Sequence, residues 1–256
     1  MGGLTVAKAI VKQLPQENLI YFGDTAHLPY GDKSPVAIRH YAEEITRYLL
    51  GKGCKAIVVA CNTASAHAYK NVRKLTPDHI PVFDVIDPVV QHASKHHQNQ
   101  KIGIIATKGT IGSGIYEKKL KKLNSKLKVV SAATPMLVPM IEESFMNQNV
   151  RQAILSAYLN QAKFTGIGAL ILGCTHYPLI IKDIRSILPR EADIIDSASI
   201  TAFAVRSKLE ALQLINPSNK RPVRQFFVSD FTQAFEKLAK RFFGDQLNLR
   251  KADIWS

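Results

Sequence analysis

Two cysteines stand in matching surroundings in this sequence. Cys61 and Cys174 each follow a run of apolar residues that closes with one small residue, and each precedes residues with amide or hydroxyl groups. The first stretch covers residues 56–65 and the second covers residues 169–178. The same arrangement used twice predicts that the two thiols face each other across one substrate.

Two thiols on opposite sides of one carbon can invert its configuration. One takes a proton from the α-carbon of an amino acid, and the other returns a proton to the opposite face. A general base works best when its pKa lies near the working pH, and a helix N-terminus lowers a cysteine pKa. Because each cysteine is expected between a strand and a helix, both pKa values are predicted to be lowered. The nearby Asn62, Thr63 and Thr175 offer donors to a carboxylate, and no cofactor is expected.

Other interpretations of the cysteines remain open. Free cysteines are often buried structural residues, and Cys54, which lacks polar neighbours of interest, is read as one. A single nucleophilic cysteine is possible, because His67 and His176 lie close in sequence to the two thiols. Zinc ligation is disfavoured, since the sequence has no Cys-x-x-Cys motif.

Apolar runs alternate with amphipathic stretches along the chain. The apolar runs are nearly continuous, which is typical of strands buried on both faces of a parallel sheet. The alternation predicts an α/β fold with mainly parallel sheets flanked by helices, and the repeated cysteine arrangement predicts two similar units. About eight strands are expected, the last at residues 224–228, before a final helix that ends at Gly244. A serine followed by a proline, Ser34-Pro35, predicts the start of another helix.

The composition restricts the class of protein. The chain has 256 residues, 46% of them hydrophobic, but no apolar run long enough to cross a bilayer and no signal peptide. Its three cysteines are too few for a disulfide framework, which favours the cytoplasm. The net charge of +14 suggests an anionic partner. Leucines recur at helical spacing within the densest lysine cluster, residues 118–128, which predicts an amphipathic helix and makes nucleic-acid binding unlikely.

Two further features have weaker functional interpretations. His92, His96 and His97 lie along a predicted helix, but no carboxylate completes a metal site, so solvated histidines are expected. The loop from Thr107 to Thr110 joins a strand to a helix and could present backbone N–H groups to an anion.

Longer motifs around both cysteines resemble those of the glutamate racemases, within the aspartate/glutamate racemase superfamily. The resemblance covers nearly the whole chain and rests on residues 2–6, 23–25, 29–31, 60–65, 106–110, 134–143 and 173–178. It implies a cofactor-independent racemase that supplies D-glutamate for bacterial peptidoglycan. It also implies two pseudo-symmetric α/β domains with the active site between them. Residues 1–86 with 197–256 would form the first domain, and residues 87–196 the second.

The resemblance also implies roles for individual residues. Cys61 would be the base for D-glutamate, and Cys174 the base for L-glutamate. His176 would assist Cys174, Glu142 would lie near it, and Asp24 would be a further charged group near the site. Substrate contacts would come from Tyr30, Gly31, Asn62, Thr63, Thr110, Thr175 and His176. No metal is implied.

The same resemblance suggests partners. Glutamate is the expected substrate and a homodimer the expected assembly, and some members of the family are reported to bind DNA gyrase. Two alternatives stay open: a racemase of aspartate or another amino acid, and a catalytically impaired homologue that acts as a binding protein.

One departure from the family pattern lies at the amino end. The family begins with a strand ending in Phe-Asp-Ser-Gly, one variable residue and a glycine pair, and Met1 stands here at the variable position. The aspartate would support the first cysteine and the serine would bind substrate. Without that strand, an unpaired gap or edge is expected in the first sheet. Either the natural start lies upstream of Met1, or the chain is truncated and impaired.

Overall fold

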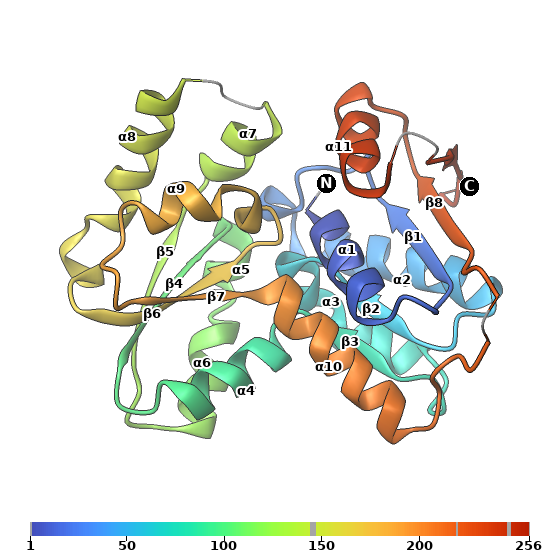
Figure 1. The fold of residues 1–256 in the computed structure, drawn as a ribbon, viewed down its shortest axis with the longest axis horizontal. Coiled ribbons are helices and arrows are strands. Elements are labelled where there is room, and N and C mark those ends of the chain that lie inside the picture. The colour runs from blue at the N-terminus through green and yellow to red at the C-terminus, as the bar shows by residue number, and fades with distance from the viewer. Residues whose placement is uncertain (1, 144–146, 219, 245–246, 256) are drawn as a thin grey trace.

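The computed structural model describes residues 2–143, 147–218, 220–244 and 247–255. Figure 1 shows that the helices and strands gather in two groups that lie side by side. All the strand pairs in the described residues are parallel. This arrangement confirms the predicted α/β fold of parallel sheets flanked by helices. Among the described residues, no helix combines the length and the apolar character needed to cross a membrane.

One group is built on a four-stranded sheet with the strand order β5-β4-β6-β7. Its strands are β4 (Lys101–Ala106), β5 (Lys128–Ala133), β6 (Ile167–Gly173) and β7 (Asp193–Asp196). Two buried clusters lie on opposite faces of this sheet. One face packs against α4 (Asp87–His96) and α6 (Ile115–Leu123), and the other against α7 (Leu137–Glu142), α8 (Gln148–Leu159) and α9 (Ile181–Arg185). Shorter elements of this group are α5 (Lys108–Gly112), η2 (Ala162–Phe164) and η3 (Tyr177–Ile180).

The central strand β6 shows why the second cysteine follows an uninterrupted apolar run. Ala169 and Ile171 belong to the cluster under α4 and α6, whereas Leu170 and Leu172 belong to the opposite cluster. Successive side chains of a strand point to opposite faces, so a strand covered on both sides must be apolar at every position. This burial fixes the register of β6 and therefore the place where Cys174 leaves the sheet.

The other group contains two smaller sheets. One has the order β1-β8-β9, and the other pairs β2 with β3. The strands are β1 (Leu19–Gly23), β2 (Ile57–Val59), β3 (Val82–Asp84), β8 (Arg224–Val228) and β9 (Leu249–Lys251). The helices are α1 (Gly3–Gln13), α2 (Pro35–Gly51), α3 (Asn62–Leu75), α10 (Ser197–Ala211) and α11 (Gln233–Phe243), with a 3-10 turn η1 (Tyr30–Asp32). Ser34 caps α2 as predicted, by accepting a hydrogen bond from the Ala37 N–H.

Two sequence-based predictions about elements were wrong. Residues 224–228 are not the last strand, because β9 follows and pairs with β8. β9 contains Leu249, Arg250 and Lys251, so it lacks the apolar run that reveals a buried strand. The helix expected across the lysine cluster also ends early, at Leu123, and the buried Leu127 packs from the turn that follows it.

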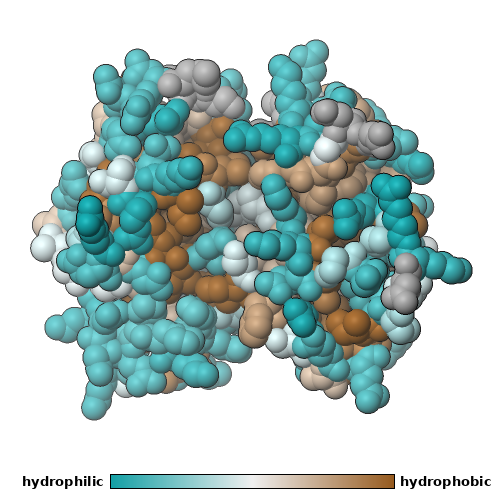
Figure 2. Space-filling model, in the orientation of Figure 1, coloured by the Kyte–Doolittle hydropathy of each residue, from teal (hydrophilic) through white to brown (hydrophobic). Residues whose placement is uncertain are grey.

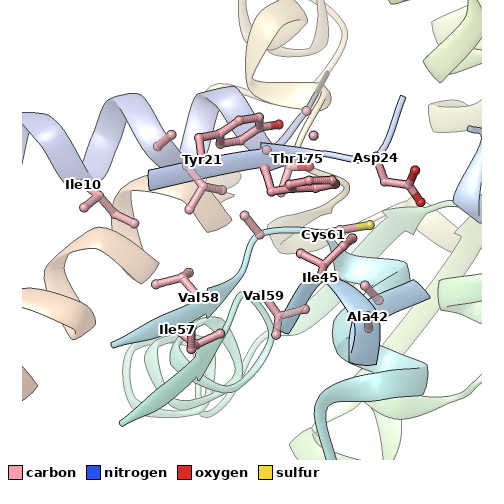
Figure 3. Close-up of a pocket in the computed structure, with 18 of the residues that line it drawn as sticks. Ile10, Tyr21, Asp24, Ala42, Ile45, Ile57, Val58, Val59, Cys61 and Thr175 are labelled. Atoms are coloured by element: carbon pink, nitrogen blue, oxygen red, sulfur yellow. The ribbon is translucent and has the colours of Figure 1, made fainter. Parts of the chain in front are cut away.

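The group with the two smaller sheets has an opening between β1 and β2. Among the described residues, β1 pairs only with β8, and β2 only with β3. Four of the five residues of β1 are only partly buried, whereas five of the six residues of β4 are fully buried. A cavity of about 1170 Å³ runs between the two strands and is lined by apolar side chains, including Ile10, Tyr21 and Val58. Figure 3 shows Tyr21 on one side of it and Val58 and Val59 of β2 on the other. The unpaired gap expected from the sequence is therefore present.

The chain passes between the two groups at β3 and again at β7. At the first passage, the buried Asp84 carboxylate accepts hydrogen bonds from the N–H groups of Ile86 and Asp87, at 2.6 and 2.8 Å. At the second, the Asp196 carboxylate caps α10 by accepting from the N–H groups of Ala198 and Ser199. Both carboxylates satisfy backbone donors that a helix leaves unpaired at its first turn, and so fix where each helix begins.

Replacing the cap of α10 is expected to destabilise the fold. Asp196→Ala should lower the free energy of unfolding by about 1 kcal/mol, because the first turn of α10 loses its acceptor. Urea unfolding monitored by circular dichroism measures this loss. Glu210→Ala is the matched control on the same helix, since Glu210 makes only an exposed i,i+4 pair with Arg206. Equal losses in the two variants would contradict the role assigned to the Asp196 cap.

Candidate active site

The fold brings both cysteines to one cavity. Cys61 follows β2 and Cys174 follows β6, and both thiols line the cavity between the two groups of elements. Ala106 pairs with Gly173, so the Thr107 loop and Cys174 leave adjacent strands at the same edge of the sheet. Ligands of parallel sheets bind at the carboxyl ends of the strands, which is where both cysteines lie. Figure 2, in the orientation of Figure 1, shows apolar side chains gathered towards the middle of the face in view and hydrophilic ones around its rim.

Cys61 has the surroundings that the sequence predicts, but not the predicted pKa. It occupies the N-cap position of α3, in an extended backbone conformation. Burial raises the pKa of the Cys61 thiol, although the N–H groups of Ala64 and Thr63 and the Thr63 hydroxyl act in the opposite direction. The loss of hydration therefore outweighs the helix N-terminus. The prediction of a lowered pKa was wrong for this thiol.

Cys174 departs further from the prediction. It precedes the four-residue 3-10 turn η3 (Tyr177–Ile180), and not the start of an α-helix. Its residue is only 6% exposed, and burial raises the pKa of the Cys174 thiol to about 12. The His176 N–H lowers this pKa, and a negative charge on Cys61 raises it, so the two thiols lie within electrostatic reach of each other. In the absence of a ligand, both cysteines are protonated at neutral pH.

A histidine and a carboxylate stand behind Cys174. Nδ1 of His176 lies 3.6 Å from the Cys174 Sγ, and Nε2 lies 2.9 Å from Oε1 of Glu142. The Gly2 N–H also points at Nε2, with the two nitrogens 3.0 Å apart, so Gly2 asks this nitrogen to accept a hydrogen bond while Glu142 asks it to donate one. We assign the proton to Nε2, because an ionised carboxylate needs a donor. Nδ1 then presents a lone pair to the thiol.

The charge states of this pair support the assignment. Burial lowers the pKa of His176, and Glu142 offsets only part of that effect. Burial raises the pKa of Glu142, but the hydrogen bond and charge of His176 outweigh it, so that this pKa lies below its usual value. A neutral imidazole beside an ionised carboxylate is suited to accept a proton from Cys174 through Nδ1.

Asp24 anchors a second polar cluster on the Cys61 side of the cavity. Oδ1 accepts from the Ser229 hydroxyl at 2.8 Å and lies 2.9 Å from His27 Nδ1, and Oδ2 accepts from the Tyr30 hydroxyl at 2.6 Å. Burial raises the pKa of Tyr30, and the charge of Asp24 raises it further. Asp24 and Tyr30 both line the cavity, as the sequence suggests. Because its oxygens are occupied by neighbours, Asp24 orients Tyr30 rather than acting as a free acid.

Hydroxyl and amide groups line the space near Cys61. The Thr63 hydroxyl lies 2.9 Å from the Thr107 hydroxyl and 3.2 Å from that of Thr110. Asn62 accepts from the Tyr116 hydroxyl through Oδ1, whereas its buried Nδ2 has no hydrogen-bond partner among the described residues. An unpaired buried amide is costly unless a ligand satisfies it. Asn62 lines the cavity, and its buried Nδ2 keeps an unused donor next to it.

The predicted substrate contacts fall into two sets. The residues that line the cavity are Tyr30, Gly31, Asn62, Thr63, Thr175 and His176. Thr110 is buried and bonds to Thr63 and Thr107 instead of lining the cavity, so its direct contact with substrate stays a prediction. Thr107, within the polar loop after β4, lines the cavity instead. Gly31 packs against this threonine, and a Cβ on Gly31 would lie 2.9 Å from its Cβ.

The other histidines named in the sequence analysis have different surroundings from His176. The Nε2–H of His67 donates to the Gly109 carbonyl at 3.0 Å, so His176 is the histidine that approaches a thiol. The expectation that His92, His96 and His97 are all solvated was wrong for His97, which is 8% exposed. A carboxylate also approaches this group, since Asp193 Oδ2 lies 3.3 Å from His97 Nε2.

Comparison with known proteins agrees with this geometry. The chain is 40% identical to a glutamate racemase of Geobacter metallireducens over 247 residues, which cover 96% of this chain and 91% of that protein. It is 42% identical over 249 residues to a glutamate racemase of Chlorobaculum tepidum, covering 96% and 90% of the two chains. The crystal structure of the Francisella tularensis glutamate racemase in complex with D-glutamate superimposes with a TM-score of 0.91 at 34% identity, covering 99% of this chain and 94% of that one. The sequence model of the Asp/Glu/hydantoin racemases matches residues 2–205. The chain belongs to the Asp/Glu/hydantoin racemase family.

Proposed function

We propose that this protein interconverts L- and D-glutamate by proton transfer between the α-carbon and two thiols, without a cofactor. The observation that carries the proposal is the meeting of Cys61 and Cys174 in one cavity, each from a different group of elements. Identities of 40% and 42% to glutamate racemases over almost the whole chain support glutamate as the substrate. The resulting D-glutamate would enter peptidoglycan.

The surroundings of the thiols suggest how each becomes a base. A buried thiol whose pKa is about 12, as for Cys174, holds its proton at neutral pH. The α-ammonium group of a bound amino acid brings a positive charge into the cavity, and an opposite charge a few ångströms away favours the thiolate. Nδ1 of His176 then receives the Cys174 proton while Glu142 holds the imidazole in place. The substrate itself thus helps to generate the base that attacks it.

The remaining groups can orient glutamate between the thiols. For L-glutamate, the Cys174 thiolate removes the α-proton and the protonated Cys61 delivers a proton to the other face; for D-glutamate the roles reverse. The hydroxyls of Thr63 and Thr175 offer donors to the carboxylates, and the unpaired Asn62 Nδ2 would add one if the side chain turned towards the substrate. A hydrogen bond that becomes stronger as negative charge develops in the transition state lowers the reaction barrier. A hydrogen bond that is equally strong to the bound substrate and to the transition state does not.

Several finer points belong to the same proposal. We infer two α/β units, residues 1–86 with 197–256 and residues 87–196, supported by the separate sheets on either side of the cavity. Hydrogen bonds join the units, including one from the Thr5 hydroxyl to the Thr175 carbonyl at 2.8 Å. A homodimer, binding to DNA gyrase and a place in the cytoplasm rest on the resemblance or the composition, and stay predictions.

We also propose that the opening between β1 and β2 accommodates one further strand. Both strands present an unpaired edge to the same apolar cavity. Gly2 packs closely against Thr175 and His176, and a Cβ added to Gly2 would clash with the Thr175 hydroxyl. A strand leading into Gly2 would therefore end at the carboxyl edge where β1 and β2 also end. An aspartate and a serine just before it, as in the resembling family, would then face the Cys61 side of the cavity.

Removing either thiol is expected to abolish racemisation. Cys61→Ala and Cys174→Ala should each lower kcat/KM at least about 1,000-fold, because general acid–base groups contribute factors of this size. Circular dichroism of L-glutamate solutions measures the rate, and in deuterated water the D-glutamate formed should carry an α-deuteron. L-aspartate, run in parallel, tests the alternative substrate. Cys54→Ala is the matched control, since Cys54 is half-buried in an apolar cluster. Full turnover by either alanine variant would rule out the two-thiol mechanism.

Neutralising Glu142 is expected to weaken the Cys174 half of the site. Glu142→Gln should lower kcat about 10- to 100-fold and increase the deuterium isotope effect for α-deuterated L-glutamate, since the imidazole loses its orienting charge. The variant should also be about 1 kcal/mol less stable at pH 7. The folded-state pKa of Glu142 is lowered, so its stabilising effect exists above the unfolded pKa and disappears as pH falls through the folded one. Urea unfolding at several pH values should show the difference between the two proteins shrinking in acid.

Supplying a strand for the opening is expected to complete the site. A chain extended before Gly2 by an apolar strand ending in Asp-Ser should be several kcal/mol more stable, because each newly buried apolar side chain contributes about 1.5–3 kcal/mol. It should also racemise at least tenfold faster, and it is the appropriate parent for the cysteine variants if the unextended chain turns over slowly. An extension ending in Ala-Ala should keep the stability and lose the rate. Full activity of the 256-residue chain with no gain in stability would contradict the proposal.

A further inference from the structure

Two histidines and one aspartate meet far from the thiols, at the opposite end of the four-stranded sheet. Asp193 is the first residue of β7 and pairs with Ala169 near the start of β6, whereas Cys174 follows the other end of β6. His92 lies in α4, and His97 is the residue at which α4 ends. One ligand atom from each of His92, His97 and Asp193 lies within 4.8 Å of the other two. We call these three residues the His-His-Asp cluster.

The His97 ring is held in a way that leaves one nitrogen without a hydrogen-bond partner. Nδ1 donates to the Gln100 side-chain carbonyl at 2.6 Å. The Gln100 side chain is itself confined, because it covers Gly168 so closely that a Cβ there would lie 2.5 Å from it. Nε2 is buried and makes no hydrogen bond within the described part of the chain. A histidine whose Nδ1–H is held by a carbonyl directs the Nε2 lone pair outward, which is the arrangement found in metal-ligating histidines.

The distance from His97 to Asp193 fits a shared cation better than a hydrogen bond. Nε2 and Oδ2 are 3.3 Å apart, but they are not aligned for an N–H···O bond. Ligands that lie about 2.0–2.1 Å from a tetrahedral zinc ion are separated from one another by about 3.3 Å. The two atoms are thus placed as two corners of such a tetrahedron. A carboxylate facing an imidazole lone pair would otherwise be repelled by it.

His92 provides the third corner. Its ring stacks on that of His96 at 4.2 Å between centroids, and His96 is tied back by its Nδ1–H, which donates to the His92 carbonyl at 2.8 Å. These contacts hold the His92 ring beside the other two residues, with one of its nitrogens within 4.8 Å of their ligand atoms. A neutral imidazole carries the lone pair that a metal requires.

We propose that His92, His97 and Asp193 form a binding site for a divalent zinc ion. Two imidazoles and one carboxylate are ligands that zinc accepts, and the partial exposure of Asp193 leaves the fourth position to water. The ion would join the carboxyl end of α4 to the amino end of β7. Since this site and the thiols lie at opposite ends of β6, the ion acts on the stability of the fold and takes no part in racemisation.

The test is zinc binding to the 256-residue chain carrying Cys54→Ser, Cys61→Ser and Cys174→Ser, which removes all three competing thiols. After treatment with EDTA and its removal, isothermal titration with zinc chloride should show one site with a micromolar dissociation constant. Asp193→Asn and His97→Gln should each weaken binding at least tenfold. His79→Ala is the matched control, because His79 is exposed and lies outside the His-His-Asp cluster, and it should bind as its parent does.

A second measurement separates binding from folding. Zinc should raise the melting temperature of the parent and of the His79→Ala variant by several degrees, and should leave that of Asp193→Asn unchanged, even if this variant starts from a lower value. Racemisation by the chain with both cysteines should be unaffected when EDTA is added. The proposal is overturned if zinc binds Asp193→Asn and His97→Gln as tightly as the parent, or if the parent binds none. In the latter case His97 and Asp193 are only neighbours and the cluster is not a metal site.

Discussion

A thiol acts as a base only as a thiolate, and both thiols of this protein lie where hydration is largely lost. Burial raises the pKa of Cys174 to about 12 and raises that of Cys61 as well, against the N–H groups aimed at each sulfur. The groups of the protein itself therefore keep the protons on sulfur. A positive charge must enter before either thiol can ionise, and the substrate of an amino-acid racemase carries one. The same burial that suppresses the thiolates would strengthen their attraction to that charge.

The two thiols must approach opposite faces of one carbon, which explains why the site lies between two groups of elements rather than within one. Each sheet can present only one edge of strand ends, so thiols on opposite faces of a carbon must come from two sheets. The contacts that align the two edges are short and polar, from Thr5 to the Thr175 carbonyl and between the hydroxyls of Thr63 and Thr107. His67, which donates to the Gly109 carbonyl, adds a third. Such bonds position the thiols while leaving the space between them open.

Features that depend on residues close together in the sequence could be predicted from it. The apolar runs before Cys61 and Cys174 predict strands, and the small and polar residues after them place the thiols at strand ends. Features that depend on packing could not be predicted. The sign of the thiol pKa shifts reflects desolvation by distant segments, and β9 exists because β8 offers it an edge. Thr107 and Thr110 are residues of the same type, and only the packing of this segment decides which of them lines the cavity.

The His-His-Asp cluster, at the other end of the sheet, also depends on packing and so could not be predicted from the sequence. His92 and His97 are five residues apart, a spacing that an ideal helix does not place on one face. They approach each other because α4 ends at His97, where the backbone leaves the helical conformation and turns the ring back. The carboxylate comes from Asp193, which follows them by nearly a hundred residues and arrives through the pairing of β6 with β7. Strand β6 thus links two sites with different roles. At its carboxyl end, side chains must change charge during each turnover. At its amino end, a bound ion would only need to hold α4 and β7 together. Because the sheet between them is buried on both faces, a bound ion could stabilise the strand that carries Cys174 without altering the charges around the thiol.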